Sequence, residues 1–234
     1  FSDGFEPRHT MASISTQTGL SRAVVRRCLY TLEQMGYVRS TANVYQLEPQ
    51  VLALAQPYFS SSSLPVLAQE FLDRVKQETN ESCSLAVLDG DDVVYVARSA
   101  AGRIMTVSIA IGSRLPAYCT SLGRVLLSAL SSDELDTYLS RVERRRHTKH
   151  PLTTVRDLKH AIARAHDQGH ALVNEELEIG LRSIAVPVRD RQHSVIAAVN
   201  VGAQATRMNQ QTMLRDILPV LRAAADDLGE RLVG

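Results

Sequence analysis

The segment from Met11 to Val38 constrains the fold more than any other part of the chain. Ser21 is a good helix N-cap, because its hydroxyl can accept a hydrogen bond from a free N–H group of the first turn. Gly36 fits the left-handed position that follows a helix. Between them, apolar residues recur at the spacing of one helical stripe, at Val25, Cys28, Leu29, Leu32 and Met35. The pattern predicts a helix that buries this stripe.

A shorter helix and a turn precede this segment. Met11 and Ile14 form a short apolar face, and Gly19 permits the positive φ that a tight turn between crossed helices needs. The series Ser15, Gly19, Val25 and Cys28 has the spacing of a helix-turn-helix. After it, Tyr37 and Val38 begin a strand, residues 41–43 form a polar tip, and residues 44–47 return as a second strand. The sequence thus predicts a winged helix-turn-helix over residues 1–48.

The exposed face of the second helix points to duplex DNA. Arginine suits both phosphate oxygens and the O6/N7 edge of guanine. The candidate DNA-contacting residues are Thr10, Ser21, Arg22, Ala23, Arg26, Arg27 and Tyr30. Two alternatives remain open: a helical hairpin in an ordinary core, and a module whose helix-turn-helix binds proteins without ligand control. Salt-insensitive complexes that lack DNA would favour the second of these.

Composition limits the partners and the compartment. The 234 residues carry a formal net charge of +1, which argues against a strongly basic nucleic-acid coat protein. The three cysteines, Cys28, Cys83 and Cys119, have neither a disulfide framework nor zinc spacing. No apolar run approaches the ~20 residues of a membrane span, and there is no signal peptide. We therefore expect a cytoplasmic protein without a membrane partner, a metal or a cofactor.

A change of pattern follows the wing. Residues 49–58 predict a short helix that stops near Pro57, and Ser60–Ser63 form a polar, flexible run. Pro65 then begins the next helix. We expect a linker helix and hinge over residues 49–63 and a second domain over residues 64–234.

The second domain alternates helices with hairpins. Helices are predicted at Leu64–Glu78, Thr120–Leu130, from Ser132, at Thr154–Gln168 and from about Asn209, where Pro219 introduces a kink. Strands are predicted at Ser82–Leu88, Val93–Ala97, Met105–Ile109, Ala171–Asn174, Ser183–Val188 and Val195–Val201. The order predicts an α/β (α+β) fold with an antiparallel sheet flanked by helices, not a doubly wound parallel sheet. No glycine-rich phosphate loop follows a strand, which argues against a nucleotide enzyme.

Several segments resemble one family closely. ESCSLAVLDGDDVVYVAR, VSIAIGSRLPAYCTSLGRVLLSAL, LVNEELEIGLRSIAVPVRD and VIAAVNVG are similar to the IclR family of bacterial transcriptional regulators, most of all to its Pca- and Pob-type branch in aromatic-acid catabolism. The resemblance implies a GAF/PAS-like effector domain, a small organic acid as effector, and a homodimer or tetramer. It also implies that the first helix of the family's DNA-binding domain is largely missing from residues 1–48. Two-fold symmetry predicts a pseudo-palindromic operator.

The effector site has two lines of support. From the residues, Tyr118, Cys119, Thr120 and Ser121 precede a helix, where hydroxyls and N–H groups, including that of Leu122, can bind a carboxylate. Met105, Val107 and Leu115 could form an apolar wall. The alternative for Thr120 and Ser121 is plain helix capping. From the resemblance, the ligand-contacting positions are Ser121, Leu122, Val173, Ser183, Asn200 and Gly202.

Four of these positions indicate a distinct effector. By the resemblance, Val173 replaces a carboxylate and Ser183 a cysteine, while Asn200 and Gly202 replace two serines. The effector should therefore differ from the short keto acids that other members sense, and an aromatic acid or a ring-cleavage product is expected. Arg103 and Arg124 could pair with its carboxylate or lie on a solvated surface.

An enzyme acting on small organic acids is the remaining alternative. Glu175 and Glu176 are neighbours, and neighbouring side chains of an extended chain point in opposite directions. Cys119 has no evident base nearby in the sequence. We expect no catalytic residues.

Overall fold

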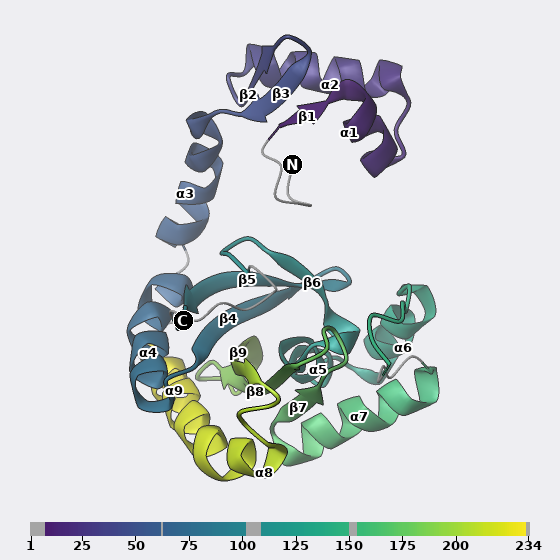
Figure 1. The fold of residues 1–234 in the computed structure, drawn as a ribbon. Helices are drawn as coiled ribbons and strands as arrows, with labels where there is room; N and C mark the ends of the chain where they lie inside the picture. Colours follow the sequence, from purple (N-terminus) through teal and green to yellow (C-terminus); the bar gives the residue numbers. More distant parts are fainter. Residues whose placement is uncertain (1–7, 62, 102–108, 150–153, 233–234) are drawn as a thin grey trace. The chain divides into compact units, whose positions relative to one another are not determined.

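The computed structural model describes residues 8–61, 63–101, 109–149 and 154–232 (Figure 1). The chain forms two compact units, residues 1–62 and residues 63–234. No helix within the described ranges is both long and apolar enough to cross a membrane.

The first unit is the predicted winged helix-turn-helix. Helix α1 (Met11–Thr18) is followed by α2 (Arg22–Gln34), and the wing consists of β2 (Val38–Thr41) and β3 (Val44–Leu47). Gly19 has a φ of 68° and makes the turn between the helices. A two-residue strand that the sequence did not predict, β1 (His9–Thr10), pairs with β3. Two residues are too few to show the alternating pattern that predicts a strand.

The core of the first unit is small. Val25 and Leu29 of α2 pack with Val38 and Tyr45 of the wing, and Met11, Ile14 and Leu32 adjoin them. The predicted burial of Cys28 and Met35 is wrong, because both are exposed. The elements packed on α2 cover the narrower stripe of Val25, Leu29 and Leu32, and the two outer positions lie beyond their reach.

The linker is more helical than predicted. A 3₁₀ turn, η1 (Pro49–Val51), leads into α3 (Leu52–Ser61), so the helix does not stop at Pro57. Proline lacks one N–H group and therefore removes one bond of the helical ladder. Its fixed φ of about −65° suits a helix, and α3 continues beyond it.

The second unit is built on a six-stranded antiparallel sheet, as predicted. Its strands lie in the order β6-β5-β4-β9-β8-β7. Their bounds are β4 (Ser82–Asp89), β5 (Asp92–Ser99), β6 (Arg114–Pro116), β7 (Ala171–Asn174), β8 (Leu181–Arg189) and β9 (Val195–Gln204). The short edge strand β6 was not predicted. The strand expected at Met105–Ile109 falls on residues 102–108, outside the described residues, and Ile109 belongs to no strand.

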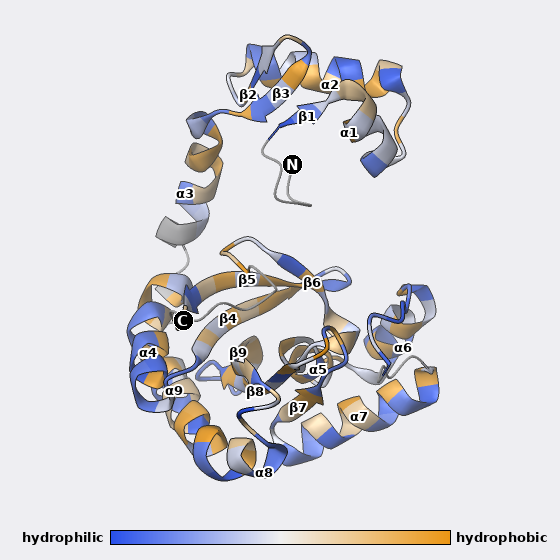
Figure 2. Ribbon diagram, in the orientation of Figure 1, coloured by the Kyte–Doolittle hydropathy of each residue, from blue (hydrophilic) through white to orange (hydrophobic). Residues whose placement is uncertain are grey.

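Helices cover both faces of the sheet (Figure 1). Their bounds are α4 (Ser63–Thr79), η2 (Ala117–Cys119), α5 (Ser121–Leu127), α6 (Ser132–Arg141), α7 (Val155–Gln168), α8 (Gln210–Thr212), the π-helical turn η3 (Met213–Ile217) and α9 (Leu218–Arg231). One apolar core lies between the sheet and α4 with α9, and a second lies on the face of α5, α6 and α7. Figure 2 shows the apolar colouring concentrated on the strands and on parts of the helices.

Local signals explain the helix ends. Thr154 caps α7 and the left-handed Gly169 ends it, as predicted. Ser131 and Glu134 form a capping box on α6. A kink was expected near Pro219, and the structure has there the π-helical turn η3, which lies immediately before α9 and its Pro219. A proline lacks the N–H group for the helical ladder, and the wider turn accommodates the missing bond.

Candidate functional site

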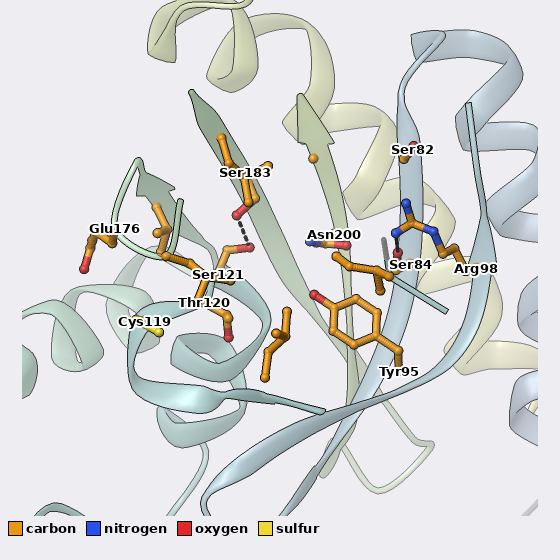
Figure 3. A pocket seen from close by; sticks show the side chains of 16 residues that line it. Ser82, Ser84, Tyr95, Arg98, Cys119, Thr120, Ser121, Glu176, Ser183 and Asn200 are labelled. Atoms are coloured by element: carbon orange, nitrogen blue, oxygen red, sulfur yellow. Dashed lines mark hydrogen bonds between the residues drawn. The ribbon is translucent and has the colours of Figure 1, made fainter. Parts of the chain in front are cut away.

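A pocket lies on the face of the sheet that α5 covers (Figure 3). Its empty volume of about 600 Å³ includes the part that opens to solvent. The lining residues are Ser82, Ser84, Tyr95, Arg98, Ile109, Leu115, Cys119, Thr120, Ser121, Val173, Glu176, Leu177, Leu181, Ser183, Asn200 and Gly202.

Strand register brings the polar residues together in two rows. Ser84 of β4 is paired with Arg98 of β5 on one side and with Asn200 of β9 on the other. A second row runs from Ser82 through Gly202 and Ser183 to Val173. Directly paired residues of an antiparallel sheet share one face. The register therefore collects polar groups from segments more than a hundred residues apart.

Helix α5 closes the pocket on the opposite side. The Thr120 hydroxyl caps the helix by accepting a hydrogen bond from the Gly123 N–H at 3.0 Å. A Cβ at Gly123 would overlap the backbone of Ala117, so only glycine allows η2 to pack this closely on α5. The Ser121 hydroxyl donates to Ser183 Oγ at 2.9 Å and joins the helix to β8. Capping and pocket lining are thus compatible roles for Thr120.

Most of the predicted effector residues meet at this pocket. Those that line it are Leu115, Cys119, Thr120, Ser121, Val173, Ser183, Asn200 and Gly202. Tyr118 differs from the prediction, because its side chain is buried in the core on the α5–α7 face. The Leu122 side chain is buried there too, but the carboxylate contact expected of the Leu122 N–H group stays a prediction. The Tyr118 hydroxyl donates to the Arg145 carbonyl oxygen at 2.9 Å. Consecutive residues of a helical turn point in different directions, so not all of this segment can face one cavity. Met105 lies outside the described residues.

The pocket residues on β4 and β5 were not predicted from the sequence. Ser82, Ser84, Tyr95 and Arg98 line it, and none was singled out. One signal was present: small polar residues at alternate positions of an otherwise apolar strand indicate a face that is not filled by core packing. Nothing in the sequence, however, gives the register that places Arg98 beside Ser84.

Arg98 is the most informative of the residues that were not predicted. It is half-buried, and its Nη1 donates to Ser84 Oγ at 3.0 Å. No carboxylate among the described residues pairs with it. Burial lowers the pKa of Arg98, yet a guanidinium stays protonated at neutral pH. The pocket therefore contains a cation without an anionic partner from the described chain.

Tyr95 adds a donor beside this cation. Its side chain is buried and its hydroxyl points towards the middle of the pocket (Figure 3). Burial raises the pKa of Tyr95 to about 12, so the hydroxyl remains protonated at neutral pH. It forms no hydrogen bond with any residue in the described ranges.

Arg124 has neither of the roles expected for it. Its Nη2 lies 2.5 Å from Glu176 Oε2 in an ion pair whose side chains are 5% and 8% exposed. The second guanidinium near the pocket is therefore already engaged by a carboxylate. Arg103 lies outside the described residues.

The two carboxylates considered for catalysis each have a partner within the chain. Glu175 Oε1 accepts a hydrogen bond from the Gly180 N–H at 2.7 Å, whereas Glu176 pairs with Arg124. Burial raises the pKa of Cys119 to about 12, which keeps its thiol protonated and poorly nucleophilic at neutral pH.

In the first unit, α2 presents a bare cationic face. Arg22, Ala23, Arg26, Arg27 and Tyr30 are all exposed. The three guanidinium groups form no hydrogen bond or ion pair with any described residue. The exposed Thr10 and Ser21 cap α1 and α2 with their hydroxyls. The arrangement leaves all three charges available for phosphate or base contacts.

Two family models match the chain in succession. A model described as the IclR helix-turn-helix domain matches residues 6–42, and one described as the bacterial transcriptional regulator IclR C-terminal domain matches residues 56–230.

Individual relatives agree with these models. The Pca regulon regulatory protein of Pseudomonas putida is 43% identical over 97% of this chain and 79% of its own length. The p-hydroxybenzoate hydroxylase transcriptional activator of Acinetobacter baylyi is 34% identical over 94% of this chain and 83% of its own. A putative transcriptional regulator from Rhodococcus has a solved structure with a TM-score of 0.81, 43% identity, and coverage of 97% and 92%. The inducer-binding domain of PobR from Acinetobacter, solved as a double mutant with 3-hydroxybenzoic acid, is 35% identical, with a TM-score of 0.66 and coverage of 70% and 97%.

Proposed function

The chain belongs to the IclR family of bacterial transcriptional regulators, and on that basis we propose that an aromatic carboxylic acid, held in the pocket beside α5, controls its binding to operator DNA. The observation that carries this proposal is the combination, in one chain, of an exposed arginine face on α2 and a pocket whose cation, Arg98, has no carboxylate partner among the described residues.

The DNA-binding half is residues 1–48. Arg22, Arg26 and Arg27 are free to contact phosphates or guanine edges. Ala23 and Tyr30 are exposed on the same helix. Thr10 and Ser21 lie at the N-termini of α1 and α2, where helix N–H groups can bind a DNA phosphate. As a homodimer or tetramer in the cytoplasm, the protein would meet a pseudo-palindromic operator through two such helices.

The effector-binding half is residues 64–234, joined by the linker of residues 49–63. The relatives support an aromatic acid, because one is named for p-hydroxybenzoate hydroxylase and another was solved with 3-hydroxybenzoic acid. Apolar residues on two sides of the pocket, including Ile109, Leu115 and Val173, suit a flat ring. Polar groups at the two ends of the pocket suit the polar substituents of an aromatic acid.

Control requires a difference between two states. The acid shifts DNA binding only if it binds one arrangement of the protein more tightly than another. The Ser121–Ser183 hydrogen bond joins α5 to β8, and the Arg124–Glu176 pair joins α5 to the loop between β7 and β8. Ser121, Ser183 and Glu176 line the pocket, so a ligand there contacts groups that fix the position of the helix.

A binding titration tests the proposal. The full chain is titrated into a labelled fragment of the promoter beside its own gene at moderate salt, with and without 4-hydroxybenzoate, 3-hydroxybenzoate and benzoate. We expect sequence-specific binding whose affinity at least one acid changes. A chain that binds no fragment specifically, or binds identically whatever acid is present, contradicts the proposal.

A further inference from the structure

The pocket is polar at two ends that differ in charge. At one end lie the Arg98 guanidinium and the Ser84 hydroxyl, and at the other lies the hydrogen-bonded pair of Ser121 and Ser183 (Figure 3). Tyr95 and Asn200 lie between them in the same view. The strands that carry Arg98 and Ser183 are three places apart in the sheet, which corresponds to about 14 Å of backbone spacing.

Among the residues that the structure describes, only those at the first end offer a cation to a ligand. Arg98 is half-buried and, among the described residues, its side chain bonds to Ser84 alone. The 8%-exposed Asn200 pairs with Ser84 on the neighbouring strand, and its amide forms no hydrogen bond with a described residue. A carboxylate between these groups would gain a charge-assisted bond to the guanidinium and neutral donors from the hydroxyl and the amide.

The second end is neutral or negative. Ser121 uses its proton on Ser183, and Ser183 keeps a hydroxyl proton to donate. The nearby Glu176 carboxylate also lines the pocket, and its charge is balanced by Arg124. A neutral hydroxyl can both donate and accept there, whereas a second carboxylate would meet Glu176.

We propose that the effector is a monocarboxylate whose carboxylate binds Arg98, Ser84 and Asn200, and whose hydroxyl, on the far side of a single ring, binds the Ser121–Ser183 pair. The inference rests on the proposed function and deepens it. It reverses the orientation expected from the sequence, in which the carboxylate would meet Thr120 and Ser121 before α5. Tyr95, between the two ends, would lie beside the ring.

Calorimetric titration of the full chain tests the orientation, because the chain has no tryptophan to report binding by fluorescence. The probes are 4-hydroxybenzoate, its neutral analogue 4-hydroxybenzamide, benzoate, and hexanedioate as a dicarboxylate. The variants are Arg98→Met and Ser183→Ala. Arg74→Met is the matched control, because Arg74 is an exposed arginine of α4 that does not line the pocket.

We expect Arg98→Met to lose roughly tenfold to a hundredfold in affinity for 4-hydroxybenzoate, the cost of a charge-assisted hydrogen bond. Its affinity for the amide should change less than threefold, and Arg74→Met should behave as the wild type. Ser183→Ala should weaken both hydroxyl-bearing ligands while leaving benzoate unaffected.

Several results would overturn the inference. Equal losses for acid and amide in Arg98→Met would make Arg98 a structural residue. A selective loss of carboxylate affinity in Ser183→Ala would mean the opposite orientation, and tighter binding of hexanedioate than of 4-hydroxybenzoate would rule out the neutral end. The first two outcomes leave the proposed function standing, whereas the third favours an aliphatic dicarboxylate over the aromatic acid. Failure of the wild type to bind any of the three aromatic probes overturns the aromatic effector itself, and the inference with it.

Discussion

Substitution of Gly123 tests whether the close packing that positions the pocket is real. A Cβ at this position would lie 2.5 Å from the carbonyl carbon of Ala117 and closer still to its oxygen and Cα. These are backbone atoms of η2, which cannot rotate aside as a side chain can. Gly123→Ala must therefore separate α5 from η2 and displace Thr120 and Ser121, two residues that line the pocket.

Two opposing effects determine how much Gly123→Ala changes the free energy of unfolding. Glycine to alanine in an open helix position stabilises by roughly 0.5–1 kcal/mol, whereas overpacking a well-filled interior costs about 1–3 kcal/mol. Because the obstacle is backbone, we expect the second effect to dominate and the net loss to be about 1–2 kcal/mol. For a unit of this size, that corresponds to a fall in melting temperature of roughly 2–8 °C.

Thermal unfolding followed by circular dichroism measures this loss, and Gly202→Ala is its matched control. A Cβ at Gly202 meets only Leu181 Cδ1, at the ordinary contact distance of 3.9 Å. The control should therefore be neutral or slightly stabilising. If Gly123→Ala melts at or above the wild-type temperature, the tight approach of η2 to α5 is refuted.

The remaining predictions concern charge and titration. Arg26→Ala should weaken operator binding. If Arg26 contacts a phosphate, the slope of log affinity against log salt concentration should fall by about 1; if it contacts guanine, discrimination at one base should fall by roughly 1–3 kcal/mol. An unchanged affinity contradicts both alternatives. A thiol reagent at pH 8 should modify the exposed Cys28 quickly and the buried Cys83 and Cys119 only on unfolding, so rapid modification of three thiols in the folded chain would count against the core. Burial raises the pKa of Cys119 from 9.0 to about 12, so its contribution to stability is complete below about pH 9 and is lost as the pH rises above it. The free energy of unfolding should thus decline above pH 9, and less steeply in Cys119→Ala; identical slopes would argue against burial of the thiol.

Elements with strong local signals could be predicted from the sequence. The turn glycine Gly19, the Thr154 cap and the terminating Gly169 each act through a few neighbouring backbone groups, and the structure confirms all three. The antiparallel sheet followed from alternating strands joined by short turns. The errors concern longer-range or weaker effects: Cys28 is exposed because only part of its helix is covered, and the helix beyond Pro57 continues because one lost hydrogen bond does not end it.

The pocket could be predicted on one side only. The segment around Thr120 and Ser121 carries a recognisable motif, and these residues line the cavity. Arg98 and Ser84 lie far from that motif in the sequence and reach the pocket through the pairing of β5 with β4 and of β4 with β9. Strand register depends on packing across the whole sheet. The assignment of Arg124 failed for a related reason, since its partner Glu176 is 52 residues away.

Binding of the acid in the pocket and binding of the operator at α2 should be energetically linked, and a closed thermodynamic cycle tests this linkage most directly. The affinity of the full chain for its operator is measured with and without saturating acid, and the affinity for the acid is measured with and without saturating operator. Linkage requires both ratios to be the same factor, and typical couplings of about 1–3 kcal/mol make that factor roughly 5 to 150. We predict equal ratios in this range. Two ratios of one, with acid and operator both bound, would show that the pocket and the DNA-binding helix are not coupled.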